Sequence, residues 1–135
     1  MTVTRINPPG LPQVEAYRQI AVATGSRTVY VAGQVAVEAD GTLVAAGDLE
    51  GQVERCYLNI ATALAGAGAT FDDVAKVTIY IVDYTPDKLA LYNAGVARAA
   101  EKLGVRPLAA GTLIGVTALA SPDFLVEVDA VAVVD

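Results

Sequence analysis

The C-terminal run from Phe124 to Val134, FLVEVDAVAVV, constrains the fold more than any other part of the sequence. It predicts a β-strand, and it is apolar on both faces apart from the two acids Glu127 and Asp129. Successive side chains of a strand point to opposite faces, so both faces of the sheet around it have to be covered. The chain offers helices enough for one face. We therefore expect other copies of the chain to cover the second face.

The remaining strands are predicted from β-branched and aromatic runs bounded by turn residues. Asp40-Gly41 is typical of a hairpin turn, across which a short strand can pair back. The expected strands cover residues 17–23, 28–35, 42–44, 73–83 and 112–118.

Two amphipathic helices are predicted between these strands. Asp48 is a typical N-cap for the first, which Gly66 and Gly68 end. The second begins at Thr85-Pro86-Asp87 and ends at Gly104. The apolar stripes are Val53, Cys56, Ile60, Leu64 and Ala67 in the first helix, and Leu89, Tyr92, Val96, Ala100 and Leu103 in the second. We expect one α+β domain over residues 1–135, with both helices on one face of a mixed six-stranded sheet.

The composition excludes several classes of function. The chain has no histidine, which removes Ser-His and Cys-His catalysis and histidine metal sites. A net charge of -6 argues against binding nucleic acid. No phosphate-binding loop has the required spacing. Cys56 stands alone and is expected to pack in the core. Neither a signal peptide nor a membrane span is recognisable, so a cytoplasmic protein is the simplest expectation.

A few polar positions are candidates for a site. Glu127 and Asp129 share one strand face among apolar neighbours, where partial desolvation would raise a carboxyl pKa and suit acid–base work. The alternative is that both acids are solvated or paired with a basic side chain. Asn93 can equally be a binding residue or an exposed residue of its helix. Tyr17 and Gln34 are plausible polar edges of a site, but such residues are more often strand surface or hydrogen-bonded structure. Gly33, inside a strand, indicates a bulge or a close backbone approach.

Taken together, these segments resemble the RidA (YjgF) family. The order and spacing of NPPGLP, YVAGQVAVEADGTLV, the long stretch from DLEGQVERCYLNI to VTIYIVD, YNAGVARA and PDFLVEVDAVAVV are similar to that family's over nearly the whole chain. The resemblance implies a chorismate-mutase-like subunit and a homotrimer with small-molecule sites in the clefts between subunits. It also implies hydrolysis of reactive enamines and imines, such as 2-iminopropanoate, to 2-keto acids and ammonia, without a metal or organic cofactor.

The resemblance also implies roles for single residues. The acid that positions the hydrolytic water corresponds to Glu127, and the glycine that shapes the pocket corresponds to Gly33. The site-lining tyrosine corresponds to Tyr17, and the helix asparagine to Asn93.

One position departs from the family pattern. The arginine that the family's deaminases use to clamp the substrate carboxylate corresponds to Gly111 here, and a following cysteine to Leu113. Arg106 lies five positions earlier, about 16 Å away along an extended chain, and Pro107 makes a looped return possible. Either Arg106 takes over substrate binding, or the ligand lacks that carboxylate.

Three functions remain open at this point. The first is a RidA-like hydrolase with a non-standard substrate, in which Glu127 activates water. The second is a non-catalytic trimer that binds a small ligand or a partner protein in the same cleft. The third, the ribonuclease activity associated with the family, fits least well with an acidic chain without histidine.

Overall fold

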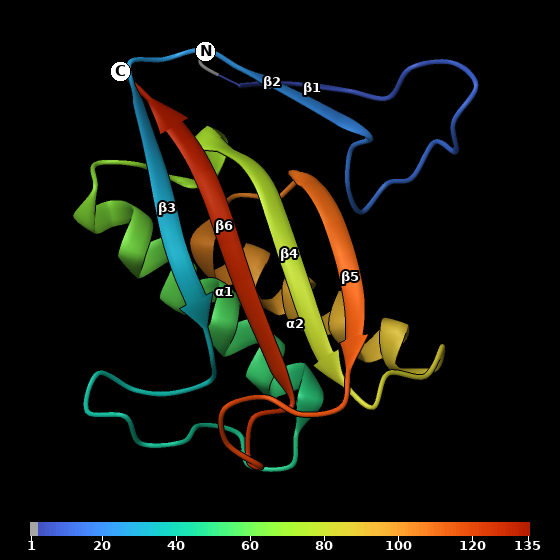
Figure 1. The fold of residues 1–135 in the computed structure, drawn as a ribbon, viewed down its shortest axis with the longest axis vertical. Coiled ribbons are helices and arrows are strands. Elements are labelled where there is room, and N and C mark those ends of the chain that lie inside the picture. Colours follow the sequence, from blue (N-terminus) through green and yellow to red (C-terminus); the bar gives the residue numbers. More distant parts are fainter. Residues whose placement is uncertain (1–2) are drawn as a thin grey trace.

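Two helices cover one face of a mixed four-stranded sheet (Figure 1). The computed structural model describes residues 3–135. β6 lies between β3 and β4 and is antiparallel to both, and β5 pairs parallel with β4 at the edge. The α+β class with both helices on one face is confirmed. The elements of this layer are β3 (Arg27–Gln34), α1 (Leu49–Gly66), a 3-10 turn η1 (Phe71–Asp73), β4 (Val74–Val82), α2 (Lys88–Leu103), β5 (Ala110–Val116) and β6 (Val126–Val134).

The expected single sheet of six strands is divided into two. β1 (Val3–Ile6) and β2 (Ile20–Ala23) form a separate antiparallel ribbon. β1 was not expected, and the strand expected over residues 17–23 is shorter. Arg5 donates hydrogen bonds to the carbonyls of Phe71, Asp72 and Val74, which fix the ribbon at the start of β4. The strand expected at 42–44 is reduced to a bridge between Val37 and Leu43.

Side chains alternate strictly along β6. Val126, Val128, Ala130, Ala132 and Val134 are buried beneath the helices, whereas the residues between them are half-buried. The intervening residues therefore project from the face that the helices leave uncovered. We call it the open face. The register adds side chains from the neighbouring strands. The open face therefore carries Thr28, Tyr30, Lys76, Thr78, Tyr80, Thr112, Ile114, Glu127, Asp129, Val131 and Val133.

α1 forms as expected. The Asp48 side chain accepts from the Gly51 amide at the N-terminus, and the predicted stripe is buried up to Leu64. The fully buried Gln52 accepts from the Leu125 amide and donates to the carbonyls of Ala45 and Asp123. α1 therefore fixes the chain just before β6.

α2 begins later than expected, and a different side of the helix is buried. Its N-cap is Asp87, which makes no side-chain capping bond, and its first helical residue is Lys88. Its buried positions are Gly95 and Ala99, whereas Leu89 is 43% exposed. The reason is close helix packing, because a Cβ on Gly95 would lie 2.6 Å from the Glu50 carbonyl oxygen and from the Cβ of Val53.

Candidate functional site

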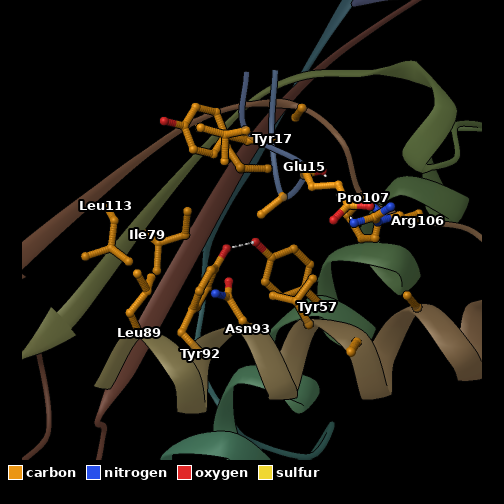
Figure 2. A pocket seen from close by; sticks show the side chains of 18 of the residues that line it. Glu15, Tyr17, Tyr57, Ile79, Leu89, Tyr92, Asn93, Arg106, Pro107 and Leu113 are labelled. Atoms are coloured by element: carbon orange, nitrogen blue, oxygen red, sulfur yellow. Dashed lines mark hydrogen bonds between the residues drawn. The ribbon is translucent and has the colours of Figure 1, made fainter. Parts of the chain in front are cut away.

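A hollow of about 1040 Å³ lies between α2, β4, β5 and the segment from Val14 to Tyr17. We call it the helix-side hollow, because the strand residues that line it, such as Ile79, belong to the helix-covered face. Four of the predicted site residues line it, namely Tyr17, Asn93, Arg106 and Gly111. Figure 2 places Tyr17 across the hollow from Asn93, which lies beside Tyr92 on α2.

A pair of tyrosines forms the polar floor of this hollow. The hydroxyls of Tyr57, on α1, and Tyr92, on α2, share a 2.6 Å hydrogen bond (Figure 2). Burial raises the pKa of Tyr92 to about 12, and burial and the neighbouring Tyr92 hold that of Tyr57 well above its usual range. Both phenols are therefore neutral near pH 7. Neither was predicted as a site residue, although Tyr57 follows Val53 by one helical turn and so belongs to the inward side of α1.

Arg106 lies at the rim of the hollow. Its guanidinium donates to the Glu15 carbonyl oxygen at 3.4 Å, and Figure 2 shows it beside Glu15 and Pro107, away from Tyr92. Glu127 projects from the open face. Within one chain, Arg106 and Glu127 therefore lie on opposite sides of the sheet.

Glu127 and Gly33 meet on the side of the sheet away from the hollow. β3 has one residue more than β6 between the pairs Val31–Ala130 and Gln34–Val128. Gly33 falls in this bulge, and a Cβ there would lie 2.7 Å from the Glu127 carboxyl carbon. The close approach expected for Gly33 is thus present, and its partner is the candidate acid.

A second acid lies on the same face. The Tyr80 hydroxyl donates to Asp129 Oδ2 at 3.4 Å, and the nearby Asp129 carboxylate raises the pKa of Tyr80. Tyr80 is the direct cross-strand neighbour of Glu127. The open face therefore combines two carboxylates with a phenol that stays protonated.

The position matched to the family arginine points away from Glu127. A Cβ on Gly111 would contact Val77 and Tyr17, at 3.6 and 3.8 Å, on the helix side. The β5 residues that share the face of Glu127 are Ala110, Thr112, Ile114 and Val116. Within one chain, a β5 side chain can reach the face of Glu127 only from an even-numbered position, such as 112 or 114.

Other candidate chemistries have no support in the part of the chain that the structure describes. Cys56 is fully buried, its Sγ lies 3.7 Å from the Val126 carbonyl oxygen, and burial raises its pKa to about 12, as expected for a packing thiol. Between residues 3 and 135, no group of three or more acidic, cysteine or histidine side chains is placed to hold a metal ion. No helix in the same range is long and apolar enough to cross a membrane.

The comparison with protein families covers almost all of the chain. Residues 10–134 match the family described as Endoribonuclease L-PSP. The chain belongs to this family, the RidA (YjgF) family. This confirms the resemblance found in the sequence.

Individual relatives agree with this assignment. The RutC family protein YjgH of Escherichia coli is 32% identical over 129 residues, 93% of this chain and 92% of that one. A RutC family protein of Pyrococcus abyssi is 38% identical over 55 residues, which cover 41% of this chain and 43% of that protein. The crystal structure of YyfB from Yersinia pestis, described as a Rid-family protein of unknown function, has 33% identity and a TM-score of 0.86 over 98% of this chain and 99% of that one. The YjgF-family fold of this chain is therefore shown over nearly all of its length.

Proposed function

We propose that this RidA-family chain hydrolyses reactive enamine or imine metabolites, with Glu127 activating the water. The observation that carries the proposal is the position of the Glu127 carboxylate against Gly33, which we call the seat of Glu127. Its carboxylate lies over the backbone of Gly33, on a strand whose alternate side chains are fixed in the core. A carboxylate held in this way has the fixed position that general base catalysis requires.

The chemistry needs a single water. The Glu127 carboxylate takes a proton from the water as the water oxygen bonds to the imine carbon, and it passes this proton to the imine nitrogen, which gives a neutral carbinolamine. Glu127 then takes the hydroxyl proton of the carbinolamine and gives it to the amino nitrogen as the C–N bond breaks, which releases ammonia, leaves the ketone and restores the carboxylate. The balance is one imine and one water to one ketone and one ammonia. No step uses a metal or cofactor.

We further propose that the protein acts as a homotrimer. Glu127 and the helix-side hollow lie on opposite sides of one chain, so a site that combines them requires a second copy. The open face has side chains suited to such an interface, including Tyr30 at 79% and Ile114 at 40% exposure. A cleft between copies would then place Glu127 of one chain near Tyr17 and Asn93 of the next.

The assay follows 2-iminopropanoate, generated by an amino-acid oxidase, with and without micromolar protein. Faster decay that Glu127→Gln abolishes and Glu38→Gln leaves intact is expected. Glu38 is an exposed loop residue and receives the same chemical change, so it is a matched control. An unchanged rate in Glu127→Gln contradicts the mechanism, and no acceleration by the wild type contradicts hydrolysis of this imine.

A second candidate function is a non-catalytic trimer that binds a small ligand. The helix-side hollow favours it, because it is large, mostly apolar and separate from Glu127. A ligand that raises the melting temperature without being converted, and whose effect Asn93→Leu removes, would support binding over catalysis.

A further inference from the structure

We infer that Lys76, positioned by Thr112, binds an anionic group of the ligand that Glu127 processes, and that this anionic group lies several bonds from the reacting carbon. The inference rests on the proposed function, because it concerns the ligand that Glu127 processes.

The first support is the register of the sheet. Lys76 on β4 pairs with Val131 of β6 and Ala110 of β5, and so belongs to the open face together with Thr78 and Tyr80. Its ammonium donates a hydrogen bond to the hydroxyl of Thr112. Thr112 shares the face of Glu127, so the lysine holds its charge on that face, opposite to the helix side toward which Gly111 points.

The second support is the charge on this face. Among residues 3–135, Lys76 is the only basic side chain that the four-stranded sheet presents on the open face. The other basic residue of the four-stranded sheet, Arg27, bonds to the carbonyl of Asp135. Arg98 and Lys102 are paired with Glu54 on the helices, and Arg106 bonds to Glu15 at the hollow. Among residues 3–135, Lys76 is therefore the one cation of the four-stranded sheet that shares the open face with the carboxylates of Glu127 and Asp129. Arg18, which bridges to Ala110 at the edge of β5, bonds to the carbonyls of Val14, Glu15 and Tyr17.

The third support is the donor capacity of the ammonium. It carries three N–H donors, and the bond to Thr112 uses one. That bond sets the direction of the flexible stem, which reduces the entropy lost when an anion is bound. A neutral hydroxyl, unlike a carboxylate, does not neutralise the charge.

The spacing on the sheet defines the ligand. Thr112 is level with Thr78 and Asp129, whereas Glu127 is level with Tyr80 and Ile114. The two levels are two residues apart, about 7 Å along the strands, and Thr112 and Glu127 are two strands apart, about 10 Å across. An imine whose only anionic group is on the adjacent carbon is too short to reach both residues. An imine derived from a dicarboxylic amino acid is a better match in length.

The test compares two imines, 2-iminopropanoate and 2-iminoglutarate, the second of which has a remote carboxylate. We expect Lys76→Met to raise KM for 2-iminoglutarate at least tenfold, with a smaller change in kcat and little change for 2-iminopropanoate. Lys76→Arg should retain most of the affinity, and Thr112→Val should give an intermediate KM. Equal KM values in wild type and Lys76→Met overturn the inference, whether or not Glu127→Gln abolishes activity.

A binding measurement separates this inference from the proposed hydrolysis. Glutarate, which cannot be hydrolysed, is titrated by calorimetry into wild-type protein and into each variant. Binding by the wild type that is at least tenfold weaker in Lys76→Met supports the role of Lys76 even if no imine is turned over. No binding by the wild type, or equal binding by both proteins, overturns it.

Light scattering on the same samples addresses a structural role. If Lys76→Met changes the oligomer mass and Lys76→Arg restores it with no effect on KM, then Lys76 pairs with another copy of the chain and the inference fails.

Discussion

The carboxylate of Glu127 occupies the space that any side chain at residue 33 would need. A Cβ on Gly33 would lie 2.7 Å from the carboxyl carbon of Glu127, inside van der Waals contact. The glycine and the acid come from strands almost a hundred residues apart in the sequence. The position of the proposed catalytic acid therefore depends on the absence of a methyl group on the neighbouring strand.

Gly33→Ala should lower activity more than stability. The new methyl group displaces the Glu127 carboxylate from its place over Gly33, and a displacement of about 1 Å can cost a hundredfold in rate. We expect kcat to fall at least tenfold, with unfolding shifted by less than about 1.5 kcal/mol. Imine hydrolysis and urea unfolding measure the two effects. Gly66→Ala, which adds its methyl group in open space, is the control, and a Gly33→Ala variant with wild-type kcat would contradict the role of the seat.

Gly95→Ala should destabilise the fold although alanine is the better helix former. The added Cβ would lie 2.6 Å from the Glu50 carbonyl oxygen and from Val53 Cβ, and backbone cannot move aside cheaply. Overpacking of this kind costs about 1–3 kcal/mol, against a gain of about 1 kcal/mol in helix propensity. A lower urea midpoint is expected, whereas Gly66→Ala should leave it unchanged or raise it. A stabilised Gly95→Ala protein would show that the helices can separate without cost.

The buried tyrosine pair should make stability fall at alkaline pH. The unfolded chain loses each phenolic proton near pH 10, whereas folded Tyr92 keeps its proton up to about pH 12. Between these values the unfolded state binds fewer protons, so the free energy of unfolding falls as pH rises. The contribution that the raised pKa of Tyr92 makes to the free energy of unfolding is fully present below pH 10. In Tyr92→Phe, the free energy of unfolding measured in urea should fall less steeply with pH, by up to about 1.4 kcal/mol per pH unit. If the free energy of unfolding depends on pH equally in the wild type and in Tyr92→Phe, the raised pKa of Tyr92 is contradicted.

Cys56 should resist alkylation in the folded protein. Burial raises its pKa to about 12, so almost no thiolate exists at pH 8, and the side chain is fully enclosed. Iodoacetamide should label less than a tenth of the native protein in an hour but all of it in urea, as mass spectrometry would report. Rapid labelling without denaturant would indicate that α1 leaves β6 frequently.

The sequence predicts those parts of the fold in which neighbouring residues decide the structure. Asp48 can be predicted as the N-cap of α1 because its capping bond joins it to Gly51, only three residues further along the chain. The alternation in β6 reveals that Glu127 and Val126 point in opposite directions. β1 was missed because it has only four residues, and because its position depends on the bonds of Arg5 to carbonyls more than sixty residues away.

The candidate site is predictable only in part for the same reason. Glu127, Tyr17 and Asn93 are identified by family pattern, but the sequence does not reveal that they lie on two sides of one sheet. The bond between Tyr57 and Tyr92 joins two helices. Likewise, the place of Lys76 beside Thr112 depends on the parallel register of β4 and β5, which no local pattern determines.

The position of Glu127 over Gly33 depends on the number of residues in β3, because this strand contains one extra residue. Between Val31 and Gln34 the strand has one residue more than β6 opposite it. A chain shortened by one residue here could still pair Gln34 with Val128, but its glycine would then stand opposite Asp129, and the seat of Glu127 would be lost. Insertions and deletions should therefore be rare in this short stretch among relatives that keep the acid, and frequent in the loop from Glu38 to Gly47, where glycines with open space around them occupy the turns.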